Sequence, residues 1–292
     1  MKEIDTMIRE DFPHVNAIRV VKEGKVLLRQ DYNGHSENDL HRTGCIFKSI
    51  VSAIVGNALK DEALATLDSK LIDYYPNYIN TDIDKNFFQL TLRDIMTKTS
   101  GILWPGPNER LPKNMEEVFL LTFKDSPGSA FEYKPDPQIM IYLIEEITHT
   151  SFIEYTDEKL FREIGINDWE WEREDIEGLK LSVDGLGDFA DLFLCKGNYK
   201  GKSIFTETFY RESTSPQSEG GFPERRKYGY YWWIDQYMGV DYYFASGFGG
   251  QIVCILPSLN ASIVIVSDMD RPHPENHAIV RNTISSLLCN IR

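Results

Sequence analysis

The sequence has few cysteines, no long apolar run and no block of basic residues. Its four cysteines in 292 residues lack CxxC pairing and the density of a disulfide framework, so we expect free thiols in a reducing cytoplasm. No segment approaches the apolar length that a membrane span needs, and Met1 to Asp11 lacks the apolar stretch of a secretory signal. The formal net charge of −14 and the scattered Lys and Arg residues argue against nucleic acids and anionic membranes as partners.

The chain does have enough apolar residues for a large core. Its 42% hydrophobic and 12% aromatic content suits one complex domain or two closely packed ones. Two β-branched-rich runs, residues 17–21 and 25–30, flank Glu23-Gly24 and predict a β-hairpin. Apolar residues recur at helical spacing over residues 46–60, which predicts a helix with one broad buried face.

The remaining elements divide the chain into a helical middle and a strand-rich end. Helices are predicted over residues 90–98, 115–123, 138–148, 152–164 and 185–195. Strands are predicted over residues 228–234, 241–245, 251–256 and 261–267, followed by a last helix at about 275–290. We therefore predict an α/β (α+β) fold in which an antiparallel sheet from both chain ends, flanked by terminal helices, packs on a mostly helical insertion. Residues 1–60 with 200–292 would form the sheet domain and 61–199 the helical domain.

One cysteine differs from the other three in its surroundings. Cys195, Cys254 and Cys289 lie among apolar residues, where we expect buried thiols. Cys45 follows a glycine at the start of a predicted helix, and Lys48 stands three positions later, so both side chains fall on one helix face. The helix N-terminus and a nearby ammonium both favour a thiolate. The alternative is a small core cysteine with a lysine that points to solvent.

Five ordered segments, from about Ile18 to Ser267, carry a resemblance to a known family. They are residues 43–50 (TGCIFKSI), 65–71 with 74–76, 90–101 (LTLRDIMTKTSG), 127–133 (PGSAFEY), and 228–233 with 247–251 (GFGGQ). The first resembles the Ser-x-x-Lys motif of serine β-lactamases and penicillin-binding proteins, in the class C-like esterase branch, with Cys45 in place of serine. The resemblance implies a β-lactamase/transpeptidase-like fold and acyl-enzyme chemistry on Cys45, with Lys48 as general base.

The same resemblance supplies two further site predictions. Tyr133 matches the tyrosine of a Tyr-x-Asn motif and would relay protons near Lys48. Pro135 stands where the motif has asparagine, so the amide that would hold a substrate carbonyl is missing. A third motif is assigned to the strand segment Phe248-Gly249-Gly250, with a hairpin turn or bulge as the alternative. The backbone N–H groups of Cys45 and Gln251 would then form an oxyanion hole.

Two functions remain open on these residues. The first is a cytoplasmic hydrolase that acts on a small ester, amide or lactam through an acyl intermediate. The second is a catalytically silent relative that uses the same cleft for ligand binding or scaffolding, which the missing motif residues favour. No cofactor is predicted. No metal is predicted either, because prolines flank His273, and His277 four residues later completes no zinc motif. A small-molecule substrate is the only partner that we expect.

Overall fold

The computed structural model describes residues 1–171, 178–270 and 276–289, and its centre is one eight-stranded sheet. The strand order is β2-β1-β13-β12-β11-β10-β9-β8, and every paired neighbour runs antiparallel. The strands are β1 Val15–Lys22, β2 Lys25–Asp31, β8 Ser218–Gly221, β9 Arg226–Tyr228, β10 Trp233–Tyr237, β11 Val240–Gly247, β12 Gln251–Leu256 and β13 Ala261–Ser267. Short strands form two smaller sheets: β3 His41–Arg42, β4 Trp169–Glu170 and β5 Lys180–Leu181, and β6 Asn198–Tyr199 with β7 Lys202–Ser203.

Both chain ends build the main sheet, as predicted. The β1–β2 hairpin turns at Glu23 and Gly24, whose φ values of 51° and 74° suit a primed turn. Strand β1 also pairs with β13, in a register that sets Val20 opposite Ile263. Residues from the two ends of the sequence therefore lie on neighbouring strands.

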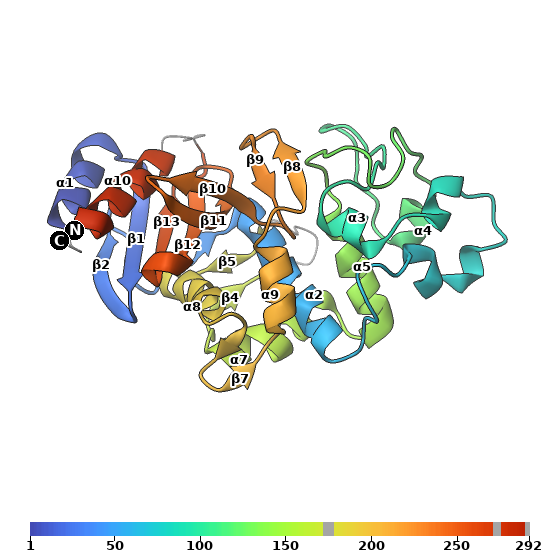
Figure 1. Cartoon of the computed structure of the whole chain (residues 1–292), viewed down its shortest axis with the longest axis horizontal. Helices are drawn as coiled ribbons and strands as arrows, with labels where there is room; N and C mark the ends of the chain where they lie inside the picture. Colours follow the sequence, from blue (N-terminus) through green and yellow to red (C-terminus); the bar gives the residue numbers. More distant parts are fainter. Residues whose placement is uncertain (172–177, 271–275, 290–292) are drawn as a thin grey trace.

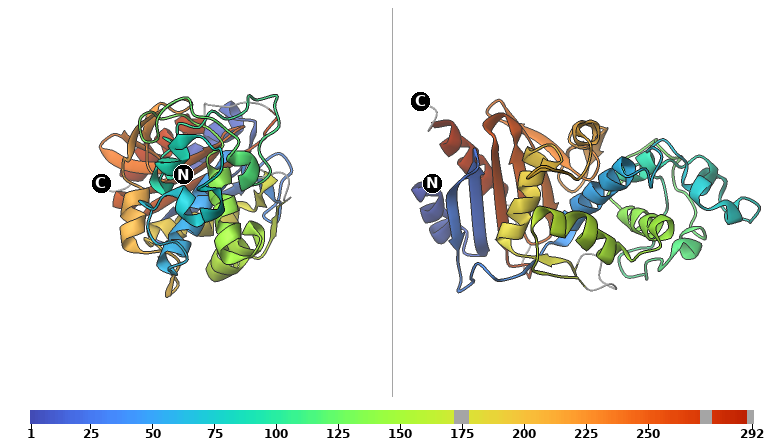
Figure 2. Two further views of the ribbon diagram at one scale, coloured as in Figure 1. Left: turned by 90° about the vertical axis from the view of Figure 1, so that its right-hand side faces the viewer. Right: turned by 90° about the horizontal axis from the view of Figure 1, so that it is seen from below.

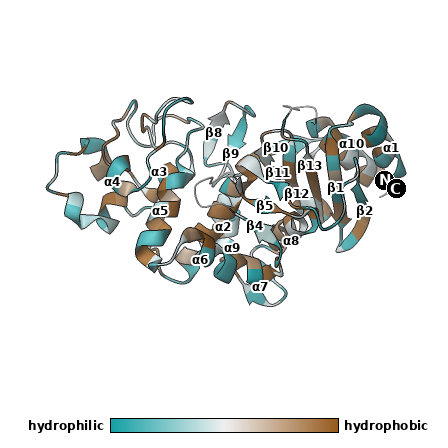
Figure 3. Cartoon of the chain, turned by 180° about the vertical axis from the view of Figure 1, so that it is seen from behind, coloured by the Kyte–Doolittle hydropathy of each residue, from teal (hydrophilic) through white to brown (hydrophobic). Residues whose placement is uncertain are grey.

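Helices cover both faces of this sheet. Helices α1 (Lys2–Asp11) and α10 (Asn276–Cys289) lie on one face and α8 (Val183–Leu194) on the other, as the right panel of Figure 2 shows. Every residue of β12 and β13 is buried, which explains why both strands are continuous apolar runs in the sequence. Figure 3 shows β13 largely hydrophobic, whereas α1 at the outer surface is largely hydrophilic. The sheet is thus the middle layer of a sandwich, as predicted.

The helical region lies beside the sheet, with α2 (Phe47–Lys60) in the middle of the molecule (Figure 1). Residues 47–58 of α2 are all buried, because α5, α9 and the turn at residues 157–161 pack around the helix. The other helices are α3 Leu92–Met96, α4 Met115–Val118, α5 Pro137–Thr148, α6 Phe152–Thr156, α7 Arg162–Ile164 and α9 Glu207–Ser213. The helices predicted at 90–98 and 115–123 are confirmed only in their central or first turns.

Two predictions about this architecture are wrong. Residues 228–234 are not one strand, because β9 ends at Tyr228 and β10 begins at Trp233. Between them Tyr231 has a left-handed φ of 62°, which no strand accommodates. Cys195 and Cys289 are exposed rather than buried, since they lie at the C-terminal ends of α8 and α10, where the apolar face ends.

The domain boundaries remain a prediction. Helix α8 falls within the predicted helical domain, yet it packs on β1, β12 and β13 of the sheet. In the described part of the chain, no helix is long and apolar enough to cross a membrane.

Candidate active site

Cys45 and Lys48 lie together where the chain enters α2. Cys45 is half-buried in a short 3₁₀ turn, Gly44–Ile46, that leads directly into the helix. The Lys48 Nζ donates a hydrogen bond to the Cys45 Sγ at 2.9 Å, and only 5% of Lys48 is exposed. The dipole of α2 presents its positive end to this sulfur. The arrangement allows the thiol proton to pass to the amine.

Hydrogen bonds from both neighbouring regions hold the turn in place. The N–H and the Oγ1 of Thr43 both donate to the carbonyl of Leu179, at 2.8 and 3.0 Å. One turn into α2, the Ser49 Oγ donates to the carbonyl of Tyr231 at 2.7 Å. These groups are buried, so their bonds are worth more than at the surface. The position of Cys45 is therefore set by Leu179, which directly precedes strand β5, and by the segment between β9 and β10.

The end of strand β11 comes into close contact with the backbone around Cys45. A Cβ on Gly247 would lie 2.5 Å from the Thr43 carbonyl oxygen and 3.3 Å from the Cys45 nitrogen. A Cβ on Gly44, whose φ is 50°, would lie 3.3 Å from the Phe248 nitrogen. Two backbone segments can approach this closely only when neither carries a side chain. The glycines thus bring the amides of Cys45 and Phe248 into one small region.

Residues 248–250 form the hairpin turn between β11 and β12, so the predicted strand assignment is wrong and the alternative turn is correct. Gly249 and Gly250 have φ values of 79° and 88°, and the Gly250 N–H donates to the Gly247 carbonyl at 3.2 Å. The side chain of Phe248 is 58% exposed. A reversal within three residues needs these left-handed conformations, which is the reason for the two glycines.

Gln251 and Asn276 connect this turn to the rest of the sheet. The Gln251 amide is fully buried, donates from Nε2 to the Ser267 carbonyl at 2.7 Å, and accepts from the Ser267 N–H at 3.0 Å. The Nδ2 of Asn276 donates to the Gly250 carbonyl at 2.7 Å and to the Ser267 Oγ at 2.8 Å. Its Oδ1 lies 2.7 Å from the His14 Nε2. The Gln251 side chain is therefore engaged with β13 rather than directed at Cys45.

Tyr133 contacts the lysine of the site through its ring. The Lys48 Nζ lies 5.4 Å from the centroid of the Tyr133 ring, within the range of a cation–π contact. The ring also stacks on Trp233, with centroids 5.5 Å apart, and meets Tyr228 edge-on at 6.3 Å. Tyr133 is half-buried in this aromatic group. The structure thus brings Tyr133 to Cys45 and Lys48, although Tyr133 is far from both in the sequence.

Comparison with known proteins identifies the family of the chain. A profile of the Beta-lactamase family matches residues 12–285. The chain belongs to the beta-lactamase family. A comparison with curated protein sequences gave no match.

Solved structures of the beta-lactamase family fold resemble the chain over nearly its whole length. The octameric penicillin-binding protein homologue from Pyrococcus abyssi has a TM-score of 0.80 at 17% identity, over 98% of this chain and 77% of that one. A Bacillus anthracis protein described as a candidate 6-aminohexanoate-dimer hydrolase has a TM-score of 0.79 at 20% identity, over 98% and 80%. The penicillin-binding protein from Bacillus halodurans has a TM-score of 0.74 at 14% identity, over 97% and 98%. At these identities the likeness shows the fold alone.

Two charged residues beside this beta-lactamase family site escaped the sequence analysis. Lys98 is 1% exposed, and its Nζ lies 5.1 Å from the centroid of the Tyr133 ring. Asp136 is equally buried and accepts hydrogen bonds from the Ser100 Oγ at 2.9 Å and the Trp104 Nε1 at 2.8 Å. Burial raises the pKa of Asp136, and the charge of Lys98 opposes that rise. The only sequence signal was a lysine within an otherwise uncharged stretch before Ser100-Gly101.

Aromatic side chains from two segments form a wall beside this site, which we call the aromatic wall: Phe131, Tyr228 and Trp233. Tyr228 is fully buried, and burial raises its pKa well above the usual value, with a further contribution from charge on Cys45. The Cys45 sulfur is thus close enough to Tyr228 to interact electrostatically. Phe131 packs edge-on against Tyr228 and Trp233, at 5.2 and 5.8 Å between centroids. The wall gives the site an apolar side next to the nucleophile.

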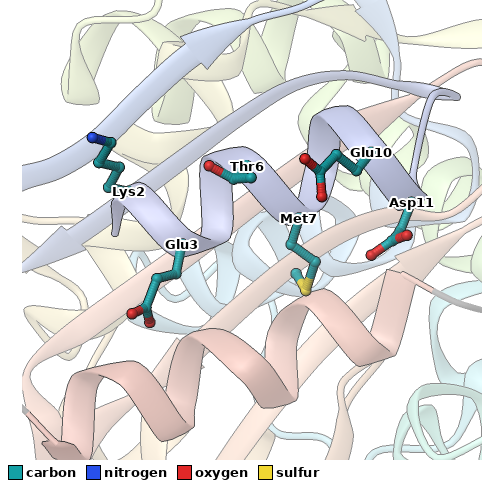
Figure 4. A pocket seen from close by; sticks show the side chains of 6 residues that line it. All are labelled: Lys2, Glu3, Thr6, Met7, Glu10 and Asp11. Carbon is teal, nitrogen blue, oxygen red and sulfur yellow. The ribbon is translucent and has the colours of Figure 1, made fainter.

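Other candidate sites are weaker. Among the described residues no group of three His, Cys, Asp or Glu side chains could hold a metal ion, and His273 lies outside those residues. His277 instead lies 2.9 Å from Glu224. A recess of about 490 Å³ follows α1 and is lined by Lys2, Glu3, Thr6, Met7, Glu10 and Asp11 (Figure 4). It lies on the outer helical layer, on the other side of the sheet from α8, and shares no residue with the Cys45 site.

Proposed function

We propose that this protein is an acyl-transfer hydrolase that forms a covalent intermediate on Cys45. The observation that carries the proposal is the 2.9 Å hydrogen bond from the Lys48 Nζ to the Cys45 Sγ at the start of a buried helix. A thiol is a weak nucleophile until it loses its proton, and an adjacent amine at a helix N-terminus favours that loss. Membership of the beta-lactamase family supports hydrolytic chemistry at this position.

The first half of the reaction would transfer an acyl group to sulfur. Lys48 would take the thiol proton while the Cys45 Sγ forms a bond to the substrate carbonyl carbon. The bond from that carbon to the leaving oxygen or nitrogen would then break, and the leaving group would take the proton back, with Tyr133 as the relay. In the second half, water would attack the thioester, and the C–S bond would break to release the acid and restore the thiol. Atoms and protons balance without a cofactor.

For the oxyanion hole we propose the backbone N–H groups of Cys45 and Phe248. The sequence predicted Gln251 as the second donor, but Gly247 and Phe248 are the residues whose backbone approaches Gly44 and Cys45. Gln251 and its buried side chain would act behind the turn by holding it to Ser267. Two preorganised N–H donors in a site that excludes most water contribute several kcal/mol to stabilising the negative charge that develops on the substrate carbonyl oxygen.

The substrate that we propose is a small ester, amide or lactam in the cytoplasm. Thiolates accept acyl groups readily from esters and thioesters, whereas amides need a well-placed proton donor for the leaving amine. The Bacillus anthracis neighbour is described as a hydrolase of a 6-aminohexanoate dimer, and this description supports a small substrate for the present chain. The aromatic wall of Phe131, Tyr228 and Trp233 favours an acyl group with apolar surface.

The second candidate is a catalytically silent protein that binds a ligand in the same place. It is favoured by Pro135 at the position of the motif asparagine and by the absence of a charged side chain in residues 245–250. Such a protein would keep the aromatic wall and the glycine turn but would not acylate Cys45.

Acylation by a p-nitrophenyl ester, followed by intact mass and peptide mapping, separates the two. We expect one acyl group per chain on Cys45, and about a 10³-fold slower reaction in Lys48→Met, because the general base is lost. Lys60→Met is the matched control, since Lys60 lies on the same helix in a surface ion pair with Asp61. Cys195 serves as the internal reference because it is exposed and its thiol pKa is raised by burial and Asp191. Labelling of Cys45 no faster than Cys195 would favour the silent protein.

A further inference from the structure

Lys98 is a buried ammonium whose position the proposed reaction does not yet use. It is 1% exposed, and its backbone has a left-handed φ of 63°. The Nζ donates to the carbonyl of Lys134 and lies 5.1 Å from the ring centroids of both Tyr133 and Tyr231. Burying a lysine is costly unless its charge is compensated. A partner of opposite charge is therefore required nearby.

Asp136 is that partner. It is 1% exposed and interacts electrostatically with Lys98. Its Oδ1 accepts two hydrogen bonds, from Ser100 and Trp104, while no hydrogen-bond donor among the described residues reaches its buried Oδ2. A carboxylate left half-satisfied in this way depends on a nearby positive charge. Lys98 thus lies beside the segment that carries both Tyr133 and Asp136, and its charge offsets part of the cost of burying that carboxyl group.

Lys98 is coupled to Tyr133 in two ways. Lys98 holds the backbone directly after Tyr133, because its acceptor is the carbonyl of the next residue. It also places a second ammonium against a ring that Lys48 already contacts at 5.4 Å. A positive charge at this range stabilises a negative charge on the phenol oxygen. Both effects act on Tyr133, whose ring contacts the lysine that donates a hydrogen bond to the Cys45 sulfur.

We propose that Lys98 is a positioning residue of the acyl-transfer site: balanced by Asp136, it fixes the segment that carries Tyr133 and supplies positive charge that makes the phenol a better proton relay. This inference rests on the proposed function. Lys98 itself is too deeply buried to meet the substrate, so it acts only through Tyr133.

The test compares the wild type with Lys98→Met/Asp136→Asn. Removing Lys98 alone would leave a buried carboxylate uncompensated and destabilise the fold, whereas the double variant removes both charges at once. We expect the double variant to unfold at a temperature close to that of the wild type. Acylation of Cys45 by the ester should be about 10- to 100-fold slower. Lys134→Met is the control. It removes a positive charge from the residue directly after Tyr133, but the Lys134 side chain lies at the surface, where it pairs with Glu132 at 3.3 Å.

A second measurement follows Tyr133 directly and does not need activity. Tyrosine labelled with ¹³C at Cζ reports the titration of each phenol, and Tyr133→Phe assigns the signal. We expect the titration midpoint of Tyr133 to rise by about one pH unit in the double variant. An unchanged midpoint, or a double variant that acylates at the wild-type rate, overturns the inference. A wild type that does not acylate Cys45 overturns the proposed function instead, while the midpoint still decides the role of Lys98.

Lys98→Arg covers the case in which the double variant does not fold. It keeps the charge and the ability to donate to the Lys134 carbonyl. We expect its acylation rate and Tyr133 midpoint to stay within about threefold and a few tenths of a unit of the wild type. The opposite outcome is a folded Lys98→Arg variant that loses most of its acylation rate while the titration midpoint of Tyr133 stays unchanged. That result would show that the shape of the side chain matters rather than its charge, and it would contradict the inference.

Discussion

The two walls of the site contribute different kinds of group. The sheet wall, at the end of β11 and the turn before β12, offers backbone N–H groups and glycines, and its buried polar side chains bond to other parts of the sheet. The helical wall offers Lys48 and Tyr133, backed by Lys98 and Asp136. The backbone donors of the sheet wall do not titrate. The charged groups of the helical wall do titrate, and they are buried away from water.

Two carboxyls with little exposure, one in each region, show the same difference. Asp136, behind the helical wall, has its pKa raised by burial. Burial also raises the pKa of Glu224. His277, Ser246 and Arg226 stabilise its negative charge by more than that, so the pKa of Glu224 is lowered overall. The sheet side thus stabilises a carboxylate fully, and the helical side only in part. We infer that the sheet wall fixes the geometry of the site, whereas the helical wall carries the groups whose charge can change.

The largest effect on the sheet wall should come from Gly247→Ala. The new Cβ would lie 2.5 Å from the Thr43 carbonyl oxygen, so the end of β11 must move away from the Cys45 amide. We expect acylation of Cys45 to slow by about 10²-fold, as for loss of an oxyanion donor. Gly106→Ala is the control, since its Cβ would meet nothing closer than 3.4 Å. Equal rates for the two variants would show that this wall contributes no donor.

A smaller effect is expected from Asn276→Ala. This change leaves the Gly250 carbonyl and the Ser267 Oγ without a buried donor, at a cost of about 1–3 kcal/mol in the free energy of unfolding. The turn should loosen, and the acylation rate should fall by about tenfold. Denaturant unfolding and the ester assay measure the two quantities. Asn282→Ala on the same helix removes only an exposed hydrogen bond to Ala278, so a similar loss there would contradict the assignment.

The smallest effect concerns the pH dependence of stability and tests whether the sheet side favours the charged carboxylate. Because the folded-state pKa of Glu224 is lowered from 4.5, its contribution is present above about pH 4.5 and is lost as the pH falls through the folded value. We expect Glu224→Gln to lower the free energy of unfolding by about 1 kcal/mol at pH 7. The difference should shrink as the pH is lowered below 4.5, as measured by urea unfolding. Glu219→Gln at an exposed position of β8 is the control, and an equal loss of stability there would contradict the assignment.

Much of the architecture could be predicted because it is local or periodic. The β1–β2 hairpin follows from two β-branched runs around Glu23-Gly24, and β12 and β13 from apolar runs. The proximity of Cys45 and Lys48 follows from helical spacing alone. These features need no knowledge of the rest of the chain.

The remaining parts of the site depend on contacts between distant segments. Nothing within residues 90–101 indicates that Lys98 reaches a carbonyl 36 positions away. The glycine-rich run has several possible hairpin registers, and the register decides whether Phe248 or Gln251 faces Cys45. The break between β9 and β10 arises where Gly229 passes close to the carbonyl of Ser213 on another element. Each of these is a property of packing that a single segment does not encode.

The pairing of β1 with β13 also has a consequence for synthesis of the protein. A nascent chain emerges from the ribosome with its first hairpin complete but with one edge of β1 unpaired until residues 261–267 have followed. Contacts of such long sequence separation are slow to form, and open strand edges invite association with other chains. We therefore expect this protein to depend on chaperones during translation more than a chain of similar size whose sheet closes locally.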